Sequence, residues 1–345
     1  MQAAPDRNRN YKCRLREMEY CGVRHIFMEN EVLRIGVAAG KGADITEFLY
    51  KPKDLDFMWH SFNPLQNPIT YAPSKQSGNG TFLDLYEGGW QELFPNYGGP
   101  VNYKGAEYGL HGEVCVVPWQ YSVELDTPEE ISINLWVRTP STPYLLERRM
   151  TLKSGVPCLY IKEKITNESP VPMEYMWGHH PVLGAPFLDE SCEIILPQSS
   201  KSYSAHTLAN AGVLPANQTQ AWPHFTDTEG NRHNLAHIQP AQAQKYREYG
   251  ISGLAQGECS VWNANQNIGF ALQWDEKQFP YLWIWEPNGG NLNHPWYGRN
   301  YVLGVEPWSH LAGSLQEVLS AGQAMVLEPW QTKETWLNAA VKLER

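Results

Sequence analysis

The chain has 345 residues, a length that fits one large domain or two of ordinary size. Its formal net charge of −10 argues against nucleic acid or an anionic membrane as the main partner, because both are bound through clustered cations. No apolar run approaches the roughly 20 residues that a transmembrane helix needs, and the first 20 residues lack the apolar centre of a signal peptide.

Cysteine and aromatic usage narrow the class of protein further. The six cysteines are scattered without a Cys-x-x-Cys pair, which favours reduced thiols in a cytoplasmic protein over a disulfide framework. The 14 Trp and 18 Tyr offer flat apolar faces with a polar handle, which suit both a β-sheet core and the C–H faces of sugars. We therefore expect a soluble, cytoplasmic, acidic protein.

Nearly all elements predicted along the chain are β-strands. Residues Ile131–Val137 alternate apolar and polar side chains with period two, which is typical of a half-buried strand. The pattern repeats in Leu145–Leu152 and Leu159–Thr166 across a turn at Lys153–Pro157. Further strands are predicted at Val32–Val37, Ile45–Tyr50, Val114–Glu124, Glu193–Leu196, Gly269–Trp274, Tyr281–Trp285 and Ala324–Pro329.

Helical periodicity is scarce in this sequence. The best short candidates lie around Gly88–Leu93 and Pro240–Tyr249. The polar, turn-rich segment Pro197–Gly257 is interpreted as long loops within one sheet system, because strands follow it. Many short strands without a βαβ rhythm or an internal repeat predict an all-β fold, a large antiparallel β-sandwich.

Three separated motifs carry the ionisable side chains that suggest chemistry. They are Gly109-Leu110-His111-Gly112, Trp177-Gly178-His179-His180-Pro181 and Gly304-Val305-Glu306-Pro307-Trp308. A proton donor that works near neutral pH and a carboxylate acceptor are what acid–base chemistry on a hydroxyl requires. Because successive strand residues point to opposite faces, only one of His179 and His180 faces a given pocket.

Other kinds of site have weaker support. Adjacent histidines on a strand do not easily reach one metal ion, and His233-x-x-x-His237 lies in a loop-rich segment without a convincing helix. No Gly-x-Ser-x-Gly motif points to a nucleophile, and no strand–Gly loop–helix context points to a phosphate loop. We therefore expect neither a metal nor a cofactor.

The ordered set of motifs resembles the aldose 1-epimerase (galactose mutarotase-like) superfamily. The run from Leu145 to Pro181 carries the likeness best, and Asn167 resembles the Asn that ends the strand before the catalytic His of the family. The tail Leu319–Leu327 resembles the strand that follows the Glu loop. The chain has Glu87–Asn96 and Gly178–Leu183 where characterised galactose mutarotases have Arg-containing and Asn-His-x-Tyr-Phe-Asn motifs, so it resembles a divergent branch.

The resemblance implies a single supersandwich domain over residues 1–345. Its core would span about residues 32–337, and residues 1–20 would be peripheral or disordered. The implied activity is the interconversion of the α and β anomers of a free aldose or aldose derivative by ring opening and reclosure, without a cofactor. His180 would be the acid at the ring oxygen, Glu306 the base at O1, and His111 a hydrogen-bonding partner that orients the sugar.

Further side chains are candidates for binding the sugar. The segment Gly88–Asn96 stands where the family places substrate-binding residues, and planar amides and carboxylates suit sugar hydroxyls. The candidates in it are Gln91, Glu92 and Asn96. Trp285 and Glu286 precede the loop Pro287–Gly290, where a Trp could stack on a pyranose ring, and His179 stays a candidate beside His180. Glu328-Pro329-Trp330 repeats the tripeptide of Glu306, and we interpret Glu328 as structural.

Three alternatives remain open. The same sandwich could be a non-catalytic carbohydrate-binding or sensing module, which would be recognised by loss of the acid or the base. A glycoside hydrolase or lyase would need a second pocket carboxylate opposite Glu306, such as Glu92 or Glu286. A hexose-6-phosphate epimerase is disfavoured, because no Arg-rich pocket motif is present. The expected partner is a small carbohydrate, and the sequence does not give the oligomeric state.

Overall fold

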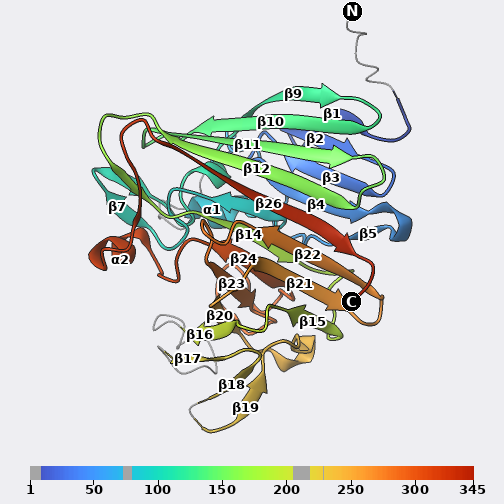
Figure 1. The fold of residues 1–345 in the computed structure, drawn as a ribbon, viewed down its shortest axis with the longest axis vertical. Helices are drawn as coiled ribbons and strands as arrows, with labels where there is room; N and C mark the ends of the chain where they lie inside the picture. The colour runs from blue at the N-terminus through green and yellow to red at the C-terminus, as the bar shows by residue number, and fades with distance from the viewer. Residues whose placement is uncertain (1–8, 73–79, 205–217, 228) are drawn as a thin grey trace, which may run out of the picture.

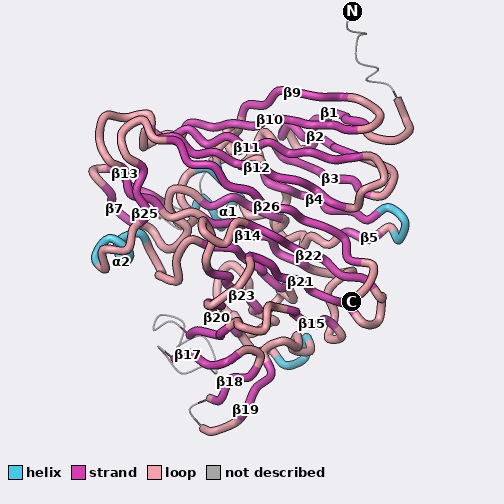
Figure 2. The backbone as a smooth tube through the Cα atoms, in the orientation of Figure 1, coloured by secondary structure: helices cyan, strands magenta, loops and turns pink. Residues whose placement is uncertain are grey.

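The computed structural model describes residues 9–72, 80–204, 218–227 and 229–345, and most of them form antiparallel strands. Two large sheets pack face to face, with β9–β12 and β26 in front of β1–β4 in Figure 1. The helices are short, and α2 lies at the periphery of the molecule (Figure 2). The prediction of an all-β sandwich is confirmed.

The first sheet contains twelve strands within the described residues. Its order across the sheet is β1 (Arg14–Tyr20), β2 (Val23–Glu29), β3 (Leu33–Ala38), β4 (Asp44–Tyr50), β6 (Trp90–Leu93), β14 (Gly178–Leu183), β24 (Leu303–Trp308), β23 (Tyr281–Glu286), β20 (Arg247–Ser252), β16 (Lys201–Ser204) and β17 (Gln218–Ala221), and β5 (Leu55–Asp56) pairs with β4. Strands from the two ends of the chain therefore meet at β6, β14 and β24.

The second sheet contains eight strands, again counted over the described ranges. Their order is β15 (Cys192–Ile195), β21 (Gly257–Asn263), β22 (Ile268–Trp274), β26 (Thr332–Lys342), β12 (Cys158–Asn167), β11 (Tyr144–Lys153), β10 (Glu130–Arg138) and β9 (Gln120–Asp126). The last strand of the chain, β26, thus lies in the middle of this sheet and joins β22 to β12.

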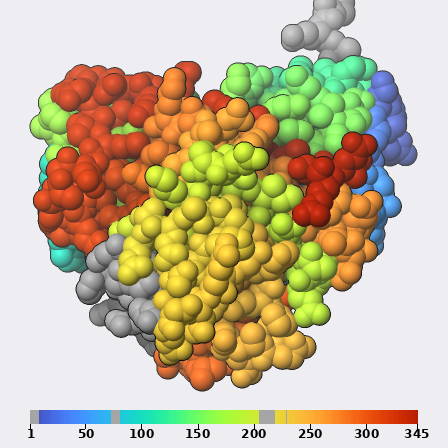
Figure 3. Space-filling view, turned by 60° about the horizontal axis from the view of Figure 1, so that its bottom comes forward, coloured from blue at the N-terminus to red at the C-terminus, as the bar shows by residue number. Residues whose placement is uncertain are grey.

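Small elements complete the fold. Short two-stranded ribbons are formed by β7 (Val101–Tyr103) with β8 (Ala106–Tyr108), β13 (Met173–Tyr175) with β25 (Met325–Leu327), and β18 (His224–Thr226) with β19 (Arg232–Asn234). The α-helices are α1 (Gly80–Leu85) and α2 (Leu315–Ser320), and 3-10 turns lie at Lys51–Lys53, Val114–Val116 and Ala241–Ala243. In Figure 3 the segment that carries β17 to β20 covers the centre of the visible face.

The alternation of side chains along the strands builds the core between the two sheets. On β10, Ile131, Ile133 and Leu135 are fully buried, whereas Asn134 and Trp136 on the other face are half-buried. Every residue of β14 is buried, because one face of the strand meets the second sheet and the other is covered by α1 and by loops. Such two-sided burial makes β14 a rigid place for functional side chains.

Both predictions of helix were wrong. The segment Gly88–Leu93 contains strand β6, and the helix α1 lies just before it, at Gly80–Leu85. Pro240–Tyr249 holds only the turn Ala241–Ala243 before strand β20 begins at Arg247. Pairing with β14 and with β23 overrides the weak local helical preference in these two segments.

The other strand predictions agree with the structure within a few residues, with one exception. The segment Val114–Glu124 is a strand only from Gln120 onward, because Val114–Val116 form a 3-10 turn. The segment Pro197–Gly257 contains strands β16 to β20 as well as loops, although part of it lies outside the described residues. At the N-terminus, β1 pairs with β2 over its whole length, and residues 1–8 lie outside the described part. No described helix is long and apolar enough to cross a bilayer.

Candidate active site

Four ionisable side chains meet in one cavity of about 160 Å³, on the face of the first sheet that is turned away from the second sheet. His111, His180 and Glu306, all predicted from the sequence, line it together with the predicted Trp285. The remaining lining residues are Phe82, Leu83, Tyr86, Glu248, Trp283, Trp296 and Trp308. The cavity therefore combines acid–base groups with a wall of aromatic rings.

His180 and Glu306 face each other at the centre of the cavity. They lie on the neighbouring antiparallel strands β14 and β24, and Nε2 of His180 is 3.4 Å from Oε1 of Glu306. Both side chains are buried, with His180 6% and Glu306 2% exposed. Oε1 of Glu306 has no hydrogen-bond partner among the described residues, so this oxygen is available to a ligand.

Two glycines make room for this pair. A Cβ atom at Gly304 would lie 2.4 Å from Oε1 of Glu306, so the carboxylate can take its position only above a residue without a side chain. At Gly178, a Cβ atom would lie 2.5 Å from the ring of Trp308, which lines the same cavity. The Gly-x-Glu and Gly-His-His spacings are thus explained by close packing around the site.

Burial controls the protonation of the pair. Burial, with a smaller effect from the charge of Glu248, holds the pKa of Glu306 well above its usual value. Burial also holds the pKa of His180 well below its usual value, and the nearby His111 adds to this. Both shifts disfavour the charged forms, so they favour a neutral imidazole at His180 beside a protonated carboxyl at Glu306.

His111 is fixed in a defined tautomer. Its Nδ1 lies within hydrogen-bond distance of the carbonyl of Tyr97, which can only accept, so Nδ1 carries the hydrogen and Nε2 is left as an acceptor. The ring centres of His111 and His180 are 5.3 Å apart. Burial lowers the pKa of His111 to about 4, so this ring is neutral at physiological pH.

Aromatic rings form the walls around these groups. The hydroxyl of Tyr86, at the end of the α1 segment, lies 3.5 Å from Nδ1 of His180. Trp285 has its ring centre 5.8 Å from that of His180 and 5.6 Å from that of Trp296. Flat apolar faces beside hydrogen-bonding groups suit a ligand with one apolar and one polar edge, as a sugar ring has.

Sequence reasoning missed Glu248 as a second carboxylate of the cavity. Its side chain accepts a hydrogen bond from the hydroxyl of Tyr246, and burial raises its pKa. The residue escaped attention because its segment was interpreted as a helix. The alternation of Tyr249 and Ile251 with Glu248, Gly250 and Ser252 along β20 is the signal that a strand prediction would have used.

His179 and Glu92 lie on the opposite face of the first sheet, between the two sheets. Nε2 of His179 is 3.0 Å from Oε2 of Glu163 on β12, and the indole N–H of Trp90 lies 3.3 Å from Nδ1 of His179. Glu92 accepts a hydrogen bond of 2.7 Å from the indole of Trp177 and pairs with Arg148. The structure does not bring these two predicted residues to the cavity, because the alternation of β6 and β14 turns them inward.

The remaining three predicted binding residues are also held away from the cavity by partners of their own. Gln91 donates to Asp44 Oδ2 at 3.1 Å. Asn96 donates to the carbonyls of Gly98 and Gly99 and accepts from the backbone of Leu315, which fixes the local loop. Glu286 pairs with Arg247 and accepts from the Gln239 backbone and from Asn288.

One buried cluster has metal-ligating groups. Within the described part of the chain, Glu92, Glu163 and His179 are the group whose ligand atoms lie close enough to share an ion. Arg148 already occupies the space between the two carboxylates, since it pairs with Glu92 and donates from Nε to Glu163 at 2.9 Å. A guanidinium in this position satisfies both carboxylates, so the cluster is better explained as a buried ion-pair network. His233 instead pairs with Asp227 at 2.8 Å.

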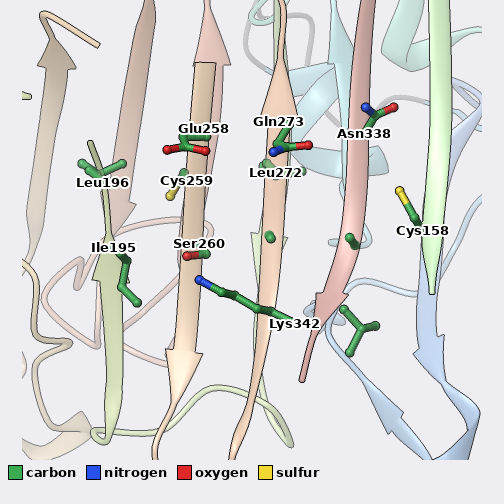
Figure 4. A pocket seen from close by; sticks show the side chains of 13 residues that line it. Cys158, Ile195, Leu196, Glu258, Cys259, Ser260, Leu272, Gln273, Asn338 and Lys342 are labelled. Atoms are coloured by element: carbon green, nitrogen blue, oxygen red, sulfur yellow. The ribbon is translucent and has the colours of Figure 1, made fainter. Parts of the chain in front are cut away.

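A hollow of about 330 Å³ lies on the exposed face of the second sheet (Figure 4). Ser260, Ala271, Ala340 and Cys158 are cross-strand neighbours there, and their small side chains form its floor. None of the predicted site residues lines it. All six cysteines, including Cys158, are free thiols.

Comparison with known proteins gives the family of the chain. A family model described as a domain of unknown function (DUF4432) matches residues 20–341. The chain belongs to the DUF4432 family. Among curated proteins, a search finds no match to this DUF4432 member.

Solved structures show which fold this DUF4432 chain has. It is similar to a Klebsiella pneumoniae protein proposed to be an aldose 1-epimerase, with a TM-score of 0.70 and 18% identity over 94% of this chain and 80% of the other. It is also similar to a galactose mutarotase-like protein from Clostridium acetobutylicum, with a TM-score of 0.67 and 14% identity over 96% of this chain and 99% of the other. A galactose mutarotase-like protein from Lactobacillus casei has a TM-score of 0.59 and 16% identity over 92% of this chain and 100% of the other. The predicted galactose mutarotase-like sandwich is confirmed, and the low identities agree with a divergent branch.

Proposed function

We propose that the protein is an aldose 1-epimerase that interconverts the α and β anomers of a free sugar. The observation that carries the proposal is the buried pair of His180 and Glu306, 3.4 Å apart, in which Oε1 of Glu306 has no hydrogen-bond partner among the described residues. Anomer exchange needs one group that takes a proton and one that gives a proton at the same carbon, and this pair supplies both from one shared proton.

The reaction balances on these two side chains. Glu306 takes the proton from O1 of the cyclic sugar while the C1–O5 bond breaks, and His180 delivers a proton to O5. Rotation about C1–C2 in the resulting aldehyde exposes its other face, and reclosure returns both protons. Hydroxyl groups of the sugar that donate to Glu306 stabilise its anionic form, so sugar binding favours transfer of the shared proton from Glu306 to His180 before the step.

The other cavity residues would position the sugar. His111 presents its Nε2 as a hydrogen-bond acceptor for one sugar hydroxyl. The two oxygens of the Glu248 carboxylate would accept hydrogen bonds from two further hydroxyls. Trp285 and Trp296 would pack against the C–H face of the ring. Among the described residues that line the cavity there is no Lys or Arg, which favours an uncharged sugar over a sugar phosphate or uronate.

The test is the rate of anomer exchange at equilibrium, measured by magnetisation-transfer NMR with a panel of free aldoses and with uronic acids as the anionic comparison. Enhanced exchange of a neutral aldose is the expected result. Binding without enhanced exchange would support a sensing module instead.

A glycoside hydrolase is the second candidate, because Glu248 and Glu306 place two carboxylates in one cavity. In this reading Glu248, and not Glu92 or Glu286, would oppose Glu306. Release of the aglycone from aryl glycosides distinguishes the two activities, since an epimerase does not act on a sugar whose O1 is substituted.

A further inference from the structure

A second cavity, of about 400 Å³, lies on the same face of the first sheet as the His180 site but shares no residue with it. Its walls come from β1, β2 and β4, from the segment after β5 and from Glu87. The boundary between the two cavities is the chain itself, since Tyr86 lines one and Glu87 lines the other. Four of the residues that line the second cavity have large, mainly apolar side chains: Met18, Tyr20, Phe27 and Leu65.

Two buried side chains of the lining, Glu87 and His25, offer hydrogen-bond acceptors, and Thr46, Ser61 and Asn63 add hydroxyl and amide groups. Glu87 is 8% exposed, its Oε2 forms an ion pair with Nζ of Lys41 at 2.8 Å, and both of its carboxylate oxygens are buried without a hydrogen-bond partner among the described residues. His25 is 4% exposed and places Nδ1 3.2 Å from the carbonyl of Val23, so Nδ1 must donate and Nε2 is left as an acceptor. Burial lowers the pKa of His25, which keeps the ring neutral.

The charges around this floor are otherwise balanced. Glu47 is paired in a fork with Arg34, and His60 is paired with Asp56 at 2.9 Å. Behind Glu87, Lys41 also pairs with Asp44, and burial raises the pKa of Asp44 to about 8. Lys41 thus lies between Asp44 and Glu87, and Oε1 of Glu87 has no hydrogen-bond donor among the described residues.

We propose that this cavity is a second ligand site that binds a small primary ammonium compound with an apolar body. An ammonium group carries three donors and no acceptor, so it can satisfy Oε1 of Glu87 and Nε2 of His25 without bringing an acceptor that needs a partner. A hydroxyl group offers a single donor and no charge, so it satisfies fewer of these acceptors than an ammonium group does. The net charge of −10 also favours the approach of a cation.

The apolar walls match the body of such a ligand. The rings of His25 and Phe27 are stacked at 20°, and Tyr20 meets His25 edge to face, so the cavity has flat aromatic surfaces beside the acceptors. A cation beside these rings gains a favourable electrostatic contact with them in addition to the hydrogen bonds.

Isothermal titration calorimetry of the full chain with 2-phenylethylammonium chloride tests the proposal, at an ionic strength near 0.15 M. The matched compounds are 2-phenylethanol, which lacks the charge, and trimethyl(2-phenylethyl)ammonium, which keeps the charge but has no donor. We expect the primary ammonium to bind at least tenfold more tightly than both. Equal affinity for the alcohol would overturn the proposal.

Variants at the exposed rim locate the site without disturbing the core. Met18 is 50% exposed, so Met18→Arg should weaken ammonium binding several-fold and Met18→Glu should strengthen it, with the anomer exchange rate unchanged in both. Glu87→Gln should abolish the preference for the ammonium. If Glu87→Gln does not fold, the two Met18 variants still test the proposal. Equal ammonium affinities of Met18→Arg and Met18→Glu would show that the ligand binds elsewhere and would contradict the proposal.

Discussion

Nε2 of His180 lies 3.4 Å from Oε1 of Glu306, with one residue on β14 and the other on the adjacent antiparallel strand β24. At this separation the two groups face each other without a hydrogen bond between them, and Oε1 of Glu306 has no hydrogen-bond partner among the described residues. The absence of a side chain at Gly304 is what allows the carboxylate to lie there. This relationship determines the predictions for activity.

Replacement of either partner should remove most of the turnover. We expect His180→Asn and Glu306→Gln each to lower kcat by about 10²- to 10⁴-fold, because each removes one side of the proton exchange. Both substitutions are close in size, so the thermal midpoint should change little. The measurement is anomer exchange, with circular dichroism as the check on folding.

Glu328→Gln is the matched control for Glu306→Gln. Glu328 stands in the same Glu-Pro-Trp tripeptide but is exposed and lies outside the cavity. Its substitution should leave the rate unchanged. A loss of rate in folded Glu328→Gln, or normal turnover in Glu306→Gln, would refute the assignment of the base.

The pH dependence of kcat/KM follows from the pKa shifts of the pair. Because burial raises the pKa of Glu306, the shared proton should be retained at neutral pH, and activity should fall only as the pH rises through that elevated value. Because burial lowers the pKa of His180, a second proton should inhibit only well below pH 6.5. Loss of activity on the acidic side at pH 6.5, as for an ordinary histidine, or the absence of any basic limb would contradict this account.

Glu248→Gln should affect binding and the pH profile together. The charge of Glu248 contributes to the raised pKa of Glu306, so its removal should move the basic limb of the profile to lower pH. Loss of a charged hydrogen-bond partner for the sugar should raise KM about 10- to 100-fold. Glu258→Gln, on the second sheet, is the control. An unchanged KM and an unshifted basic limb would remove Glu248 from the site.

The buried ion-pair network should matter for stability. Arg148→Met leaves Glu92 and Glu163 without their cation between the sheets, and we expect the free energy of unfolding to fall by about 3–5 kcal/mol. Arg149→Met is the control at the next position, since Arg149 pairs with Glu124 at the surface and its loss should cost less than about 1 kcal/mol. Urea denaturation measures both, and equal losses would show that the network contributes nothing special.

Much of the fold could be predicted from period-two patterns, because strands such as β10, β11 and β12 have one face in the core and one in solvent. The period-two pattern does not predict a strand that is buried on both faces, because such a strand does not alternate apolar and polar side chains. The segment of β6 looked helical for this reason, although it pairs with β14.

The site was predictable where a motif carries its own spacing. His111, His180 and Glu306 were found because glycine or proline stands beside each, and the structure relates two of these glycines to close packing. Gln91, Glu92, Asn96 and Glu286 could not be assigned correctly from sequence, because their partners Asp44, Arg148, Leu315 and Arg247 are distant along the chain. Glu248 could not be found without the correct secondary structure of β20.

The most direct test of the central claim is the anomer exchange rate of a neutral aldose, measured by magnetisation-transfer NMR in parallel for the native protein, Glu306→Gln and Glu328→Gln. The account predicts enhanced exchange with the native protein and with Glu328→Gln, and near-background exchange with Glu306→Gln. Enhanced exchange that persists in Glu306→Gln would contradict it, as would a native protein that binds the sugar in its cavity without accelerating exchange.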